Sequence, residues 1–240
     1  MLTPSSNTVV EPYTQALLAP LFPEVTAHFS RLRVLTISLD AVANQQFDLA
    51  PMQAAADLLV DAKVDVMAWN GTSSSWLGFD KDVALTRALE AQTRVATTSA
   101  ILGLNALLAA MSVRRLALVT PYVGSVQQRI IANYAAIGVE VVAERHLETS
   151  DNFAFAEVSE ARIAELCREV AKARPEAIAI VCTNMRGPMI ARALEAELGI
   201  TILDSVAFTL WATLARAQVD MAPLHHFGRL FTVDGSTLHP

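Results

Sequence analysis

The sequence predicts an α/β fold of two pseudo-symmetric lobes, each a parallel sheet flanked by helices, with the active site in the cleft between them. Three observations carry this prediction. Strand-like and helix-like segments alternate along the 240 residues, which is typical of βαβ units. The strand-like runs are nearly all apolar, as expected of strands covered on both faces. The motifs of the first half of the chain also recur, in the same order, in the second half.

The first half carries the elements of one lobe. Leu2-Thr3-Pro4 leads into a helix, and a strand before Pro4 would have only three residues, so either this strand is truncated or the coding sequence starts upstream. Residues 51–63 are predicted to be helical because one stripe holds Met52, Ala55, Ala56, Leu59 and Val60. The remaining segments are strands at 27–35 and 64–69 and helices at 83–92 and 99–111, the last capped by Ser99.

The second half repeats this alternation. Gly138 and Gly199 are expected to stop two of its helices, and Asp204 or Ser205 is expected to cap the last one. The predicted strands are 116–120, 139–143, 177–181 and 200–203, and the predicted helices are 126–137, 159–173, 188–198 and 206–216.

An internal repeat predicts where the functional site lies. Thr3-Pro4 recurs as Thr120-Pro121, 117 residues later. The strand at 64–69 ends in Asn70-Gly71-Thr72-Ser73, and the strand at 177–181 ends in Cys182-Thr183-Asn184. Parallel sheets bind ligands at the carboxyl ends of their strands, so two facing lobes would enclose a cleft. We assign residues 1–97 plus 205–240 to the first lobe and 98–204 to the second.

Composition excludes several classes of function. A net charge of −6 without a basic run argues against a nucleic-acid partner. The longest apolar stretch, residues 100–111, is too short to span a membrane. With no signal-peptide pattern and two cysteines that form no disulfide framework, the chain is expected to be cytoplasmic. No HExxH, paired CxxC, GxGxxG or Walker motif occurs, so we expect no metal and no cofactor. Whether the chain forms a homo-oligomer stays open.

The two cysteines receive opposite interpretations. Cys182 directly follows an apolar strand, where nearby backbone N–H groups can lower a thiol pKa and favour chemistry. The alternative is a small buried hydrophobic residue. Cys167 lies on a helical stripe that predicts core packing, together with Ile163, Leu166 and Val170.

Two hydroxyl-rich loops are candidate anion sites. Gly71, Thr72 and Ser73 can present N–H and O–H donors after a buried strand, and the loop that begins at Pro4 allows the same interpretation. The alternative for both loops is a helix cap or an ordinary loop without a ligand.

Several motifs together resemble the aspartate/glutamate racemase superfamily, in its maleate isomerase and arylmalonate decarboxylase branch. They are residues 1–8 (MLTPSSNT), Thr120-Pro121-Tyr122, Asp151-Asn152 and residues 181–186 (VCTNMR). The resemblance implies two lobes, no metal or organic cofactor, and a small carboxylate or dicarboxylate substrate. It also implies that Asn7, Tyr122 and Asn152 hold substrate carboxylates and that Cys182 is the second-lobe cysteine.

One position departs from the two-cysteine pattern that the resemblance implies for racemases and maleate isomerases. Gly71 stands where their first-lobe cysteine is expected. Gly71-Thr72-Ser73 instead resembles the decarboxylase, which works with one cysteine, whereas the Pro-Ser-Ser-Asn-Thr and Asp-Asn segments are closer to maleate isomerase.

The leading hypothesis is therefore decarboxylation of a malonate-type acid. Thr72, Ser73 and Tyr122 would hold one carboxylate, an apolar pocket at Trp69 or Trp76 would favour loss of the other, and Cys182 would protonate the carbanion. The alternatives are a maleate cis-trans isomerase or a racemase-like isomerase, and, in another class, a carboxylate-binding protein without turnover.

Overall fold

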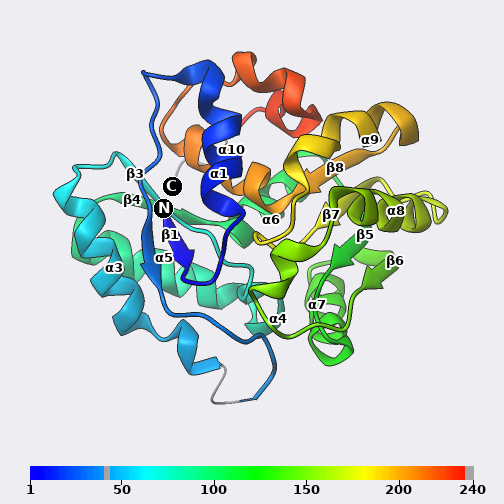
Figure 1. Cartoon of the computed structure of the whole chain (residues 1–240), viewed down its shortest axis with the longest axis horizontal. Coiled ribbons are helices and arrows are strands. Elements are labelled where there is room, and N and C mark those ends of the chain that lie inside the picture. Colours follow the sequence, from blue (N-terminus) through cyan, green and yellow to red (C-terminus); the bar gives the residue numbers. More distant parts are fainter. Residues whose placement is uncertain (41–43, 236–240) are drawn as a thin grey trace.

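Two four-stranded parallel sheets organise the fold of the computed structural model, which describes residues 1–40 and 44–235 (Figure 1). Their strand orders are β2-β1-β3-β4 and β6-β5-β7-β8. Numbering each sheet from its own first strand gives the same order, 2-1-3-4, in both. The predicted α/β fold with two similar sheets is confirmed.

The first sheet contains short strands, namely β1 (Leu2–Pro4), β2 (Ser30–Leu32), β3 (Val66–Trp69) and β4 (Ala96–Ser99). The helices of this part are α1 (Val10–Leu18), α3 (Leu49–Asp61), α4 (Ser74–Leu77), α5 (Phe79–Thr93) and α6 (Ala100–Ala110), with 3-10 turns at Ala19–Leu21 and Gln45–Phe47.

The second sheet contains β5 (Arg115–Thr120), β6 (Glu140–His146), β7 (Ala177–Ile180) and β8 (Thr201–Asp204). Its helices are α7 (Gly124–Ala136), α8 (Glu160–Ala171), α9 (Ala191–Leu198) and α10 (Ser205–Arg216). Further 3-10 turns lie at Ala154–Glu157, Pro188–Ile190, Ala222–Phe227 and Arg229–Thr232.

The predicted helix ends are largely confirmed. The Ser99 hydroxyl accepts the Leu102 N–H at 3.1 Å and caps α6. Of the two caps proposed for α10, Asp204 is the one used, because its side chain accepts the N–H groups of Val206 and Ala207. Gly138 and Gly199 follow α7 and α9 with positive φ angles of 77° and 71°, as a helix stop requires.

The first sheet differs most from the prediction. The strand expected at 27–35 is only Ser30–Leu32, because it pairs with β1 alone and β1 has three residues. The strand β4 was not predicted, since Thr97, Thr98 and Ser99 give it no apolar run. This strand crosses the proposed lobe boundary at residues 97/98, and the lobe boundaries stay a prediction.

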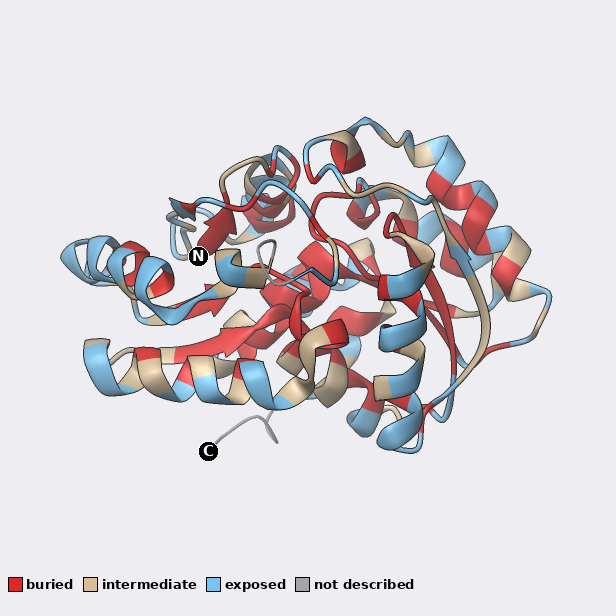
Figure 2. Ribbon diagram, turned by 90° about the horizontal axis from the view of Figure 1, so that it is seen from below, coloured by how far each residue is buried: buried red, intermediate tan, exposed pale blue. Residues whose placement is uncertain are grey.

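Buried strands and one buried helix form the core (Figure 2). Every residue of β7 and β8 is buried, which explains the apolar runs in their sequences. The helix α10 is buried from Ser205 to Ala212 without interruption. It packs on α1, α6, β3, β4 and β8 and so touches both sheets. No helix within the described residues is long and apolar enough to cross a membrane.

A buried carboxyl group links three helical segments near β4. Asp82 of α5 is 2% exposed and accepts a hydrogen bond of 2.5 Å from the hydroxyl of Ser99, the cap of α6. The hydroxyl of Ser74, in α4, lies close enough to act on its pKa, although among the described residues it makes no hydrogen bond. Burial raises the pKa of Asp82 from 3.8 to about 6, against the opposing effect of these two hydroxyls.

Replacing this carboxyl by an amide should flatten the pH dependence of stability. The pKa of Asp82 is higher in the folded state than in the unfolded chain, so the folded state holds the proton more tightly. The resulting stabilisation is fully present below about pH 4 and is lost as the pH rises through about 6, on the order of 2 kcal/mol. In urea titrations, Asp82→Asn should lose less stability over this range than the native protein. Asp80→Asn, at an exposed carboxylate of the same helix, is the control and should leave the slope unchanged.

Candidate active site

The carboxyl ends of the central strands of both sheets meet at a small enclosed pocket. Its lining consists of Pro4, Val34, Ile37, Phe47, Trp69, Gly71, Thr72, Ser73, Trp76, Tyr122, Asn152, Cys182 and Thr183. Eight of the nine predicted site residues are among them: Pro4, Gly71, Thr72, Ser73, Tyr122, Asn152, Cys182 and Thr183. The structure thus brings together side chains far apart in the sequence, while their roles toward a substrate stay predictions.

Strand ends position these residues. Pro4 is the last residue of β1, and the loop 70–73 follows β3. Tyr122 lies just beyond β5, and Cys182 lies just beyond β7. The strands β1 and β3 are the inner strands of the first sheet, and β5 and β7 are those of the second. The pocket therefore lies where parallel sheets ordinarily bind ligands.

The loop 71–73 offers unpartnered donors. Within the described residues, the backbone N–H groups of Gly71, Thr72 and Ser73 donate to no other protein group. Ser73 precedes α4, yet its side chain makes no capping hydrogen bond. The helix-cap alternative is therefore wrong for this hydroxyl. Three successive amides beside two hydroxyls form an arrangement that can bind an anion.

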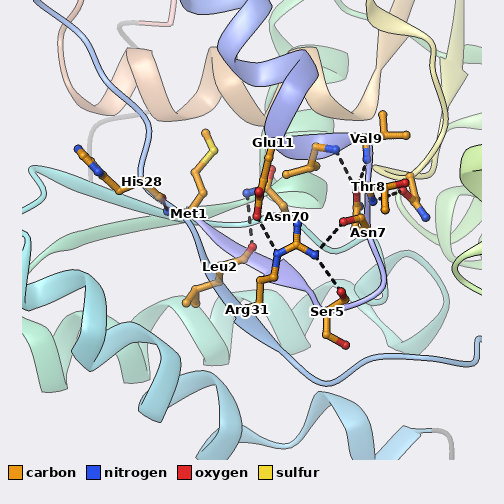
Figure 3. A network of polar contacts seen from close by, with 12 residues as sticks. Met1, Leu2, Ser5, Asn7, Thr8, Val9, Glu11, His28, Arg31 and Asn70 are labelled. Carbon is orange, nitrogen blue, oxygen red and sulfur yellow. Dashed lines mark hydrogen bonds and ion pairs between the residues drawn. The ribbon is translucent and has the colours of Figure 1, made fainter.

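Asn7 has a different position from the other predicted residues. Its Oδ1 accepts the N–H groups of Val9 and Val10, each at 2.9 Å, at the start of α1 (Figure 3). Its Nδ2 donates to the Thr183 hydroxyl at 3.1 Å. Asn7 is 1% exposed and lies behind the residues that line the pocket. Of the two interpretations of its loop, the helix cap therefore fits Asn7. Its contact with a substrate carboxylate stays a prediction.

An arginine holds the loop that carries Asn7. The Arg31 guanidinium donates to the carbonyls of Ser5 at 2.9 Å and Asn7 at 3.1 Å, and it pairs with Glu11 at 2.9 Å (Figure 3). The ion pair is partly exposed and contributes little on its own. Its two bonds to carbonyls fix the path of the chain between β1 and α1.

Hydrogen bonds between the two halves of the chain close one side of the pocket. The N–H of Ile37 donates to Ser150 at 2.8 Å, and the N–H of Asn152 donates to Leu35 at 2.9 Å. The Asn152 side chain donates to the Ser6 hydroxyl at 2.7 Å. These contacts bring Val34 and Ile37 to the pocket. Sequence reasoning missed both residues and Phe47, because an apolar residue that lines a pocket cannot be told from a core residue by its sequence neighbours.

The Tyr122 hydroxyl lies within the pocket and is neutral. It forms a hydrogen bond of 2.6 Å with Thr72 across the two halves of the chain. Its ring contacts the Trp76 ring edge-on, with centroids 5.2 Å apart. Complete burial raises its pKa well above the ordinary value, with a further contribution from Cys182. The Tyr122 oxygen thus lies between the Thr72 hydroxyl and the Cys182 thiol.

Cys182 is a protonated thiol in this site. The residue is 3% exposed, and its backbone N–H donates to the Ser205 hydroxyl at 2.9 Å. Burial raises the pKa of the thiol to about 12, and hydrogen bonds from the Asn184 N–H and the Tyr122 hydroxyl only partly oppose this. The expectation of a lowered thiol pKa is therefore wrong, because the strand end is enclosed rather than open to water. Cys167 is completely buried on the inner stripe of α8, as predicted.

The described residues, 1–40 and 44–235, contain no group of three or more His, Cys, Asp or Glu side chains arranged to hold a metal ion. The chemical groups in the pocket are one thiol, a set of hydroxyls and amides, and two indoles. They can bind an anion and transfer a proton.

Comparisons with known proteins agree on one family and two activities. The family model described as arylmalonate decarboxylase matches residues 10–231. The maleate isomerase of Geobacillus stearothermophilus is 25% identical over 227 residues, covering 89% of each chain. The arylmalonate decarboxylase of Bordetella bronchiseptica is 29% identical over 170 residues, covering 69% of this chain and 70% of that protein. The solved structure of Nocardia farcinica maleate cis-trans isomerase bound to TRIS shares the fold, with a TM-score of 0.86 and 24% identity over 98% of this chain and 97% of that one.

Cys182 should resist alkylation of the folded protein at neutral pH. A pKa of about 12 in place of 9 leaves roughly 10³-fold less thiolate. Reaction with iodoacetamide, followed by mass spectrometry, should therefore be slow and should accelerate about tenfold per pH unit. Both cysteines should react readily in urea, which serves as the control. Modification of Cys182 within minutes at neutral pH would contradict the protonated state.

Proposed function

Since the chain belongs to the arylmalonate decarboxylase family, we propose that it is a cofactor-independent decarboxylase of malonate-type acids with Cys182 as its proton donor. The resemblance to this branch of the superfamily is confirmed by the match over residues 10–231. Both named relatives are enzymes, each named for a carboxylic acid, and this chain is an enzyme of that kind. We favour decarboxylation over isomerisation because the pocket holds a single thiol and this thiol is protonated.

Binding of the substrate would use the unpartnered donors of the loop 71–73. One carboxylate of the acid accepts hydrogen bonds from these amides and from the hydroxyl pair of Thr72 and Tyr122. The other carboxylate lies toward the apolar side of the pocket, where the side chains of Val34, Ile37 and Phe47 offer it no donor. A carboxylate with few hydrogen bonds is destabilised relative to neutral carbon dioxide.

Decarboxylation breaks the bond between the α-carbon and this second carboxylate. Carbon dioxide leaves, and the electron pair of the bond stays on the α-carbon as an enediolate with the remaining carboxylate. The donors of the loop 71–73 then face a more negative oxygen than in the ground state. Removing one such donor typically costs about 10²–10³ in rate.

Protonation completes the reaction. The Cys182 thiol gives its proton to the α-carbon and becomes a thiolate, which regains a proton from water before the next turnover. The Asn184 N–H and the Tyr122 hydroxyl, both bonded to the sulfur, stabilise that thiolate. Delivery from one side of the pocket yields one enantiomer of the product.

The alternative activity is isomerisation of maleate or a racemase-like exchange. The number of maleate isomerases among the relatives and the TM-score of 0.86 to one of them favour it. A mechanism that uses two thiols, however, would need a second cysteine beside the substrate in addition to Cys182. Position 71 has no side chain, and Cys167 lies in the core of α8. A carboxylate-binding protein without turnover has less support, since both kinds of relative are named as enzymes.

A substrate panel tests the proposed activity. Purified protein is supplied with malonate, methylmalonate, phenylmalonate and maleate, and carbon dioxide and fumarate are measured. We expect carbon dioxide from at least one malonate and no fumarate. Cys182→Ala should lower the rate by about 10²–10⁴. Cys167→Ala, the matched control, should keep the rate within a few-fold and lose roughly 1 kcal/mol of stability. Fumarate without carbon dioxide would instead establish the isomerase.

The Tyr122 hydroxyl should contribute to turnover without being needed for folding. Tyr122→Phe removes the partner of Thr72 and a donor to Cys182, so we expect kcat to fall by about 10–10²-fold. Tyr134→Phe is the matched control, because Tyr134 is also buried and its hydroxyl has no hydrogen-bond partner in the part of the chain that the structure describes. Equal kinetics for the two variants would remove Tyr122 from the mechanism.

A further inference from the structure

The indole of Trp69 occupies the space that a side chain at position 71 would need. A Cβ atom built on Gly71 would lie 2.0 Å from Cζ2, 2.2 Å from Cε2 and 2.6 Å from Nε1 of Trp69. Contacts under 3.0 Å are not found for real Cβ atoms. Trp69 ends β3 and Gly71 follows two residues later, so the indole folds over the loop that carries the unpartnered amides.

This indole separates two spaces. On one side is the catalytic pocket, with a cavity volume of only about 20 Å³. On the other side is a cavity of about 350 Å³ at α3 and α5, where Leu49, Met52 and Leu85 are among the lining residues. The two spaces share Phe47, Trp69 and Ser73. A smaller side chain at position 69 would therefore join them.

The indole N–H lacks a partner. Trp69 is completely buried, and its Nε1 has no hydrogen-bond acceptor within the described residues. An indole N–H only donates, and a buried donor without an acceptor is costly. This nitrogen lies 2.6 Å from the place that a Cβ of Gly71 would take, and the Gly71 amide also donates to no protein group among the described residues. Both donors suit the same acceptor, a carboxylate oxygen of the substrate.

A cavity of about 20 Å³ holds roughly one water molecule. Any dicarboxylic acid is larger, so its binding requires lining side chains to yield space. Trp69 is among the largest of these side chains, and it has a free cavity behind it.

We infer that Trp69 is a specificity-determining residue of this site, which limits the α-substituent of the acid to a small group and donates its N–H to the carboxylate. The inference rests on the proposed function for the class of substrate. With Trp69 in place, an acid with a methyl substituent fits better than one with a phenyl ring. With a smaller residue there, the phenyl ring enters the apolar cavity at α3 and α5, where its burial is favourable.

Binding constants test this without relying on turnover. Dissociation constants of methylmalonate and phenylmalonate are measured by titration calorimetry in a Cys182→Ala background. Adding Trp69→Leu should raise the affinity for phenylmalonate relative to methylmalonate by at least about tenfold. Adding Trp69→Phe, which keeps a ring in the wall but removes the N–H, should weaken both acids about tenfold.

Trp211→Phe is the matched control. Trp211 is also completely buried, but its Nε1 donates to the Val233 carbonyl at 3.0 Å and its indole lines neither cavity. This variant should leave both dissociation constants unchanged. If it changed the ratio as Trp69→Leu does, the effect would be general loosening, and the inference would be overturned.

A second measurement tests the position of the indole even if the Trp69→Leu protein does not fold. Gly71→Ala places a Cβ within the indole, so its melting temperature, followed by circular dichroism, should fall by several degrees. An unchanged melting temperature would show that the indole does not occupy this space.

The outcomes separate this inference from the proposed activity. The expected binding ratios without carbon dioxide release would support the role of Trp69 and refute the decarboxylase. An unchanged ratio in a folded Trp69→Leu protein would overturn the inference, as would a preference for phenylmalonate with Trp69 intact. Failure of both acids to bind any variant would overturn it as well.

Discussion

The hydroxyl of Thr183 joins the two halves of the molecule at the base of the pocket. It donates to the carbonyl of Asn70 at 2.9 Å and accepts from the side chain of Asn7 at 3.1 Å. Asn7 in turn holds the first amides of α1, and Asn70 follows β3. All three residues are buried, so each of these bonds forms where an unpaired group would cost free energy. The facing arrangement of the two sheets depends on this match of loops at their carboxyl ends.

The burial that stabilises this junction also determines the protonation states of the groups in the site. The loops exclude water, and the same desolvation raises the pKa of Cys182 and of Tyr122. Both groups are consequently proton donors in the resting protein. A nucleophilic or basic thiol would need the opposite environment, with water or a cation beside the sulfur. The enclosed pocket is thus suited to protonating a carbanion and poorly suited to removing a proton.

The two halves of the site are similar in topology and different in chemistry. Each supplies a loop after the second inner strand of its sheet, β3 or β7. The second loop presents the thiol of Cys182, whereas the first presents bare amides at Gly71 with the Trp69 indole over them. Under the proposed function, this asymmetry would give the pocket one acid and one anion-binding wall. It results from the residues at positions 69 and 71, a tryptophan and a glycine, rather than from a change of fold.

The sequence by itself determined the order of elements, the similarity of the two sheets and most of the pocket. The order of elements, the similarity of the sheets and the loops at Gly71 and Cys182 follow from local patterns: apolar runs at β5, β7 and β8, stop signals at Gly138 and Gly199, and polar residues placed directly after strands. Tyr122 and Asn152 carry no such local signal and followed only from the resemblance to a known family. The sequence could not reveal β4, whose threonines resemble a loop, or the short span of β2, which its partner β1 limits.

Only the tertiary structure decided which groups are enclosed. Asn7 proved to hold α1 behind the pocket, the thiol of Cys182 is protonated rather than activated, and Val34, Ile37 and Phe47 complete the lining. The position of the Trp69 indole over Gly71 likewise appears only in three dimensions. Desolvation, steric exclusion and hydrogen-bond partners are properties of the packed surroundings, which distant segments supply together and no single segment encodes.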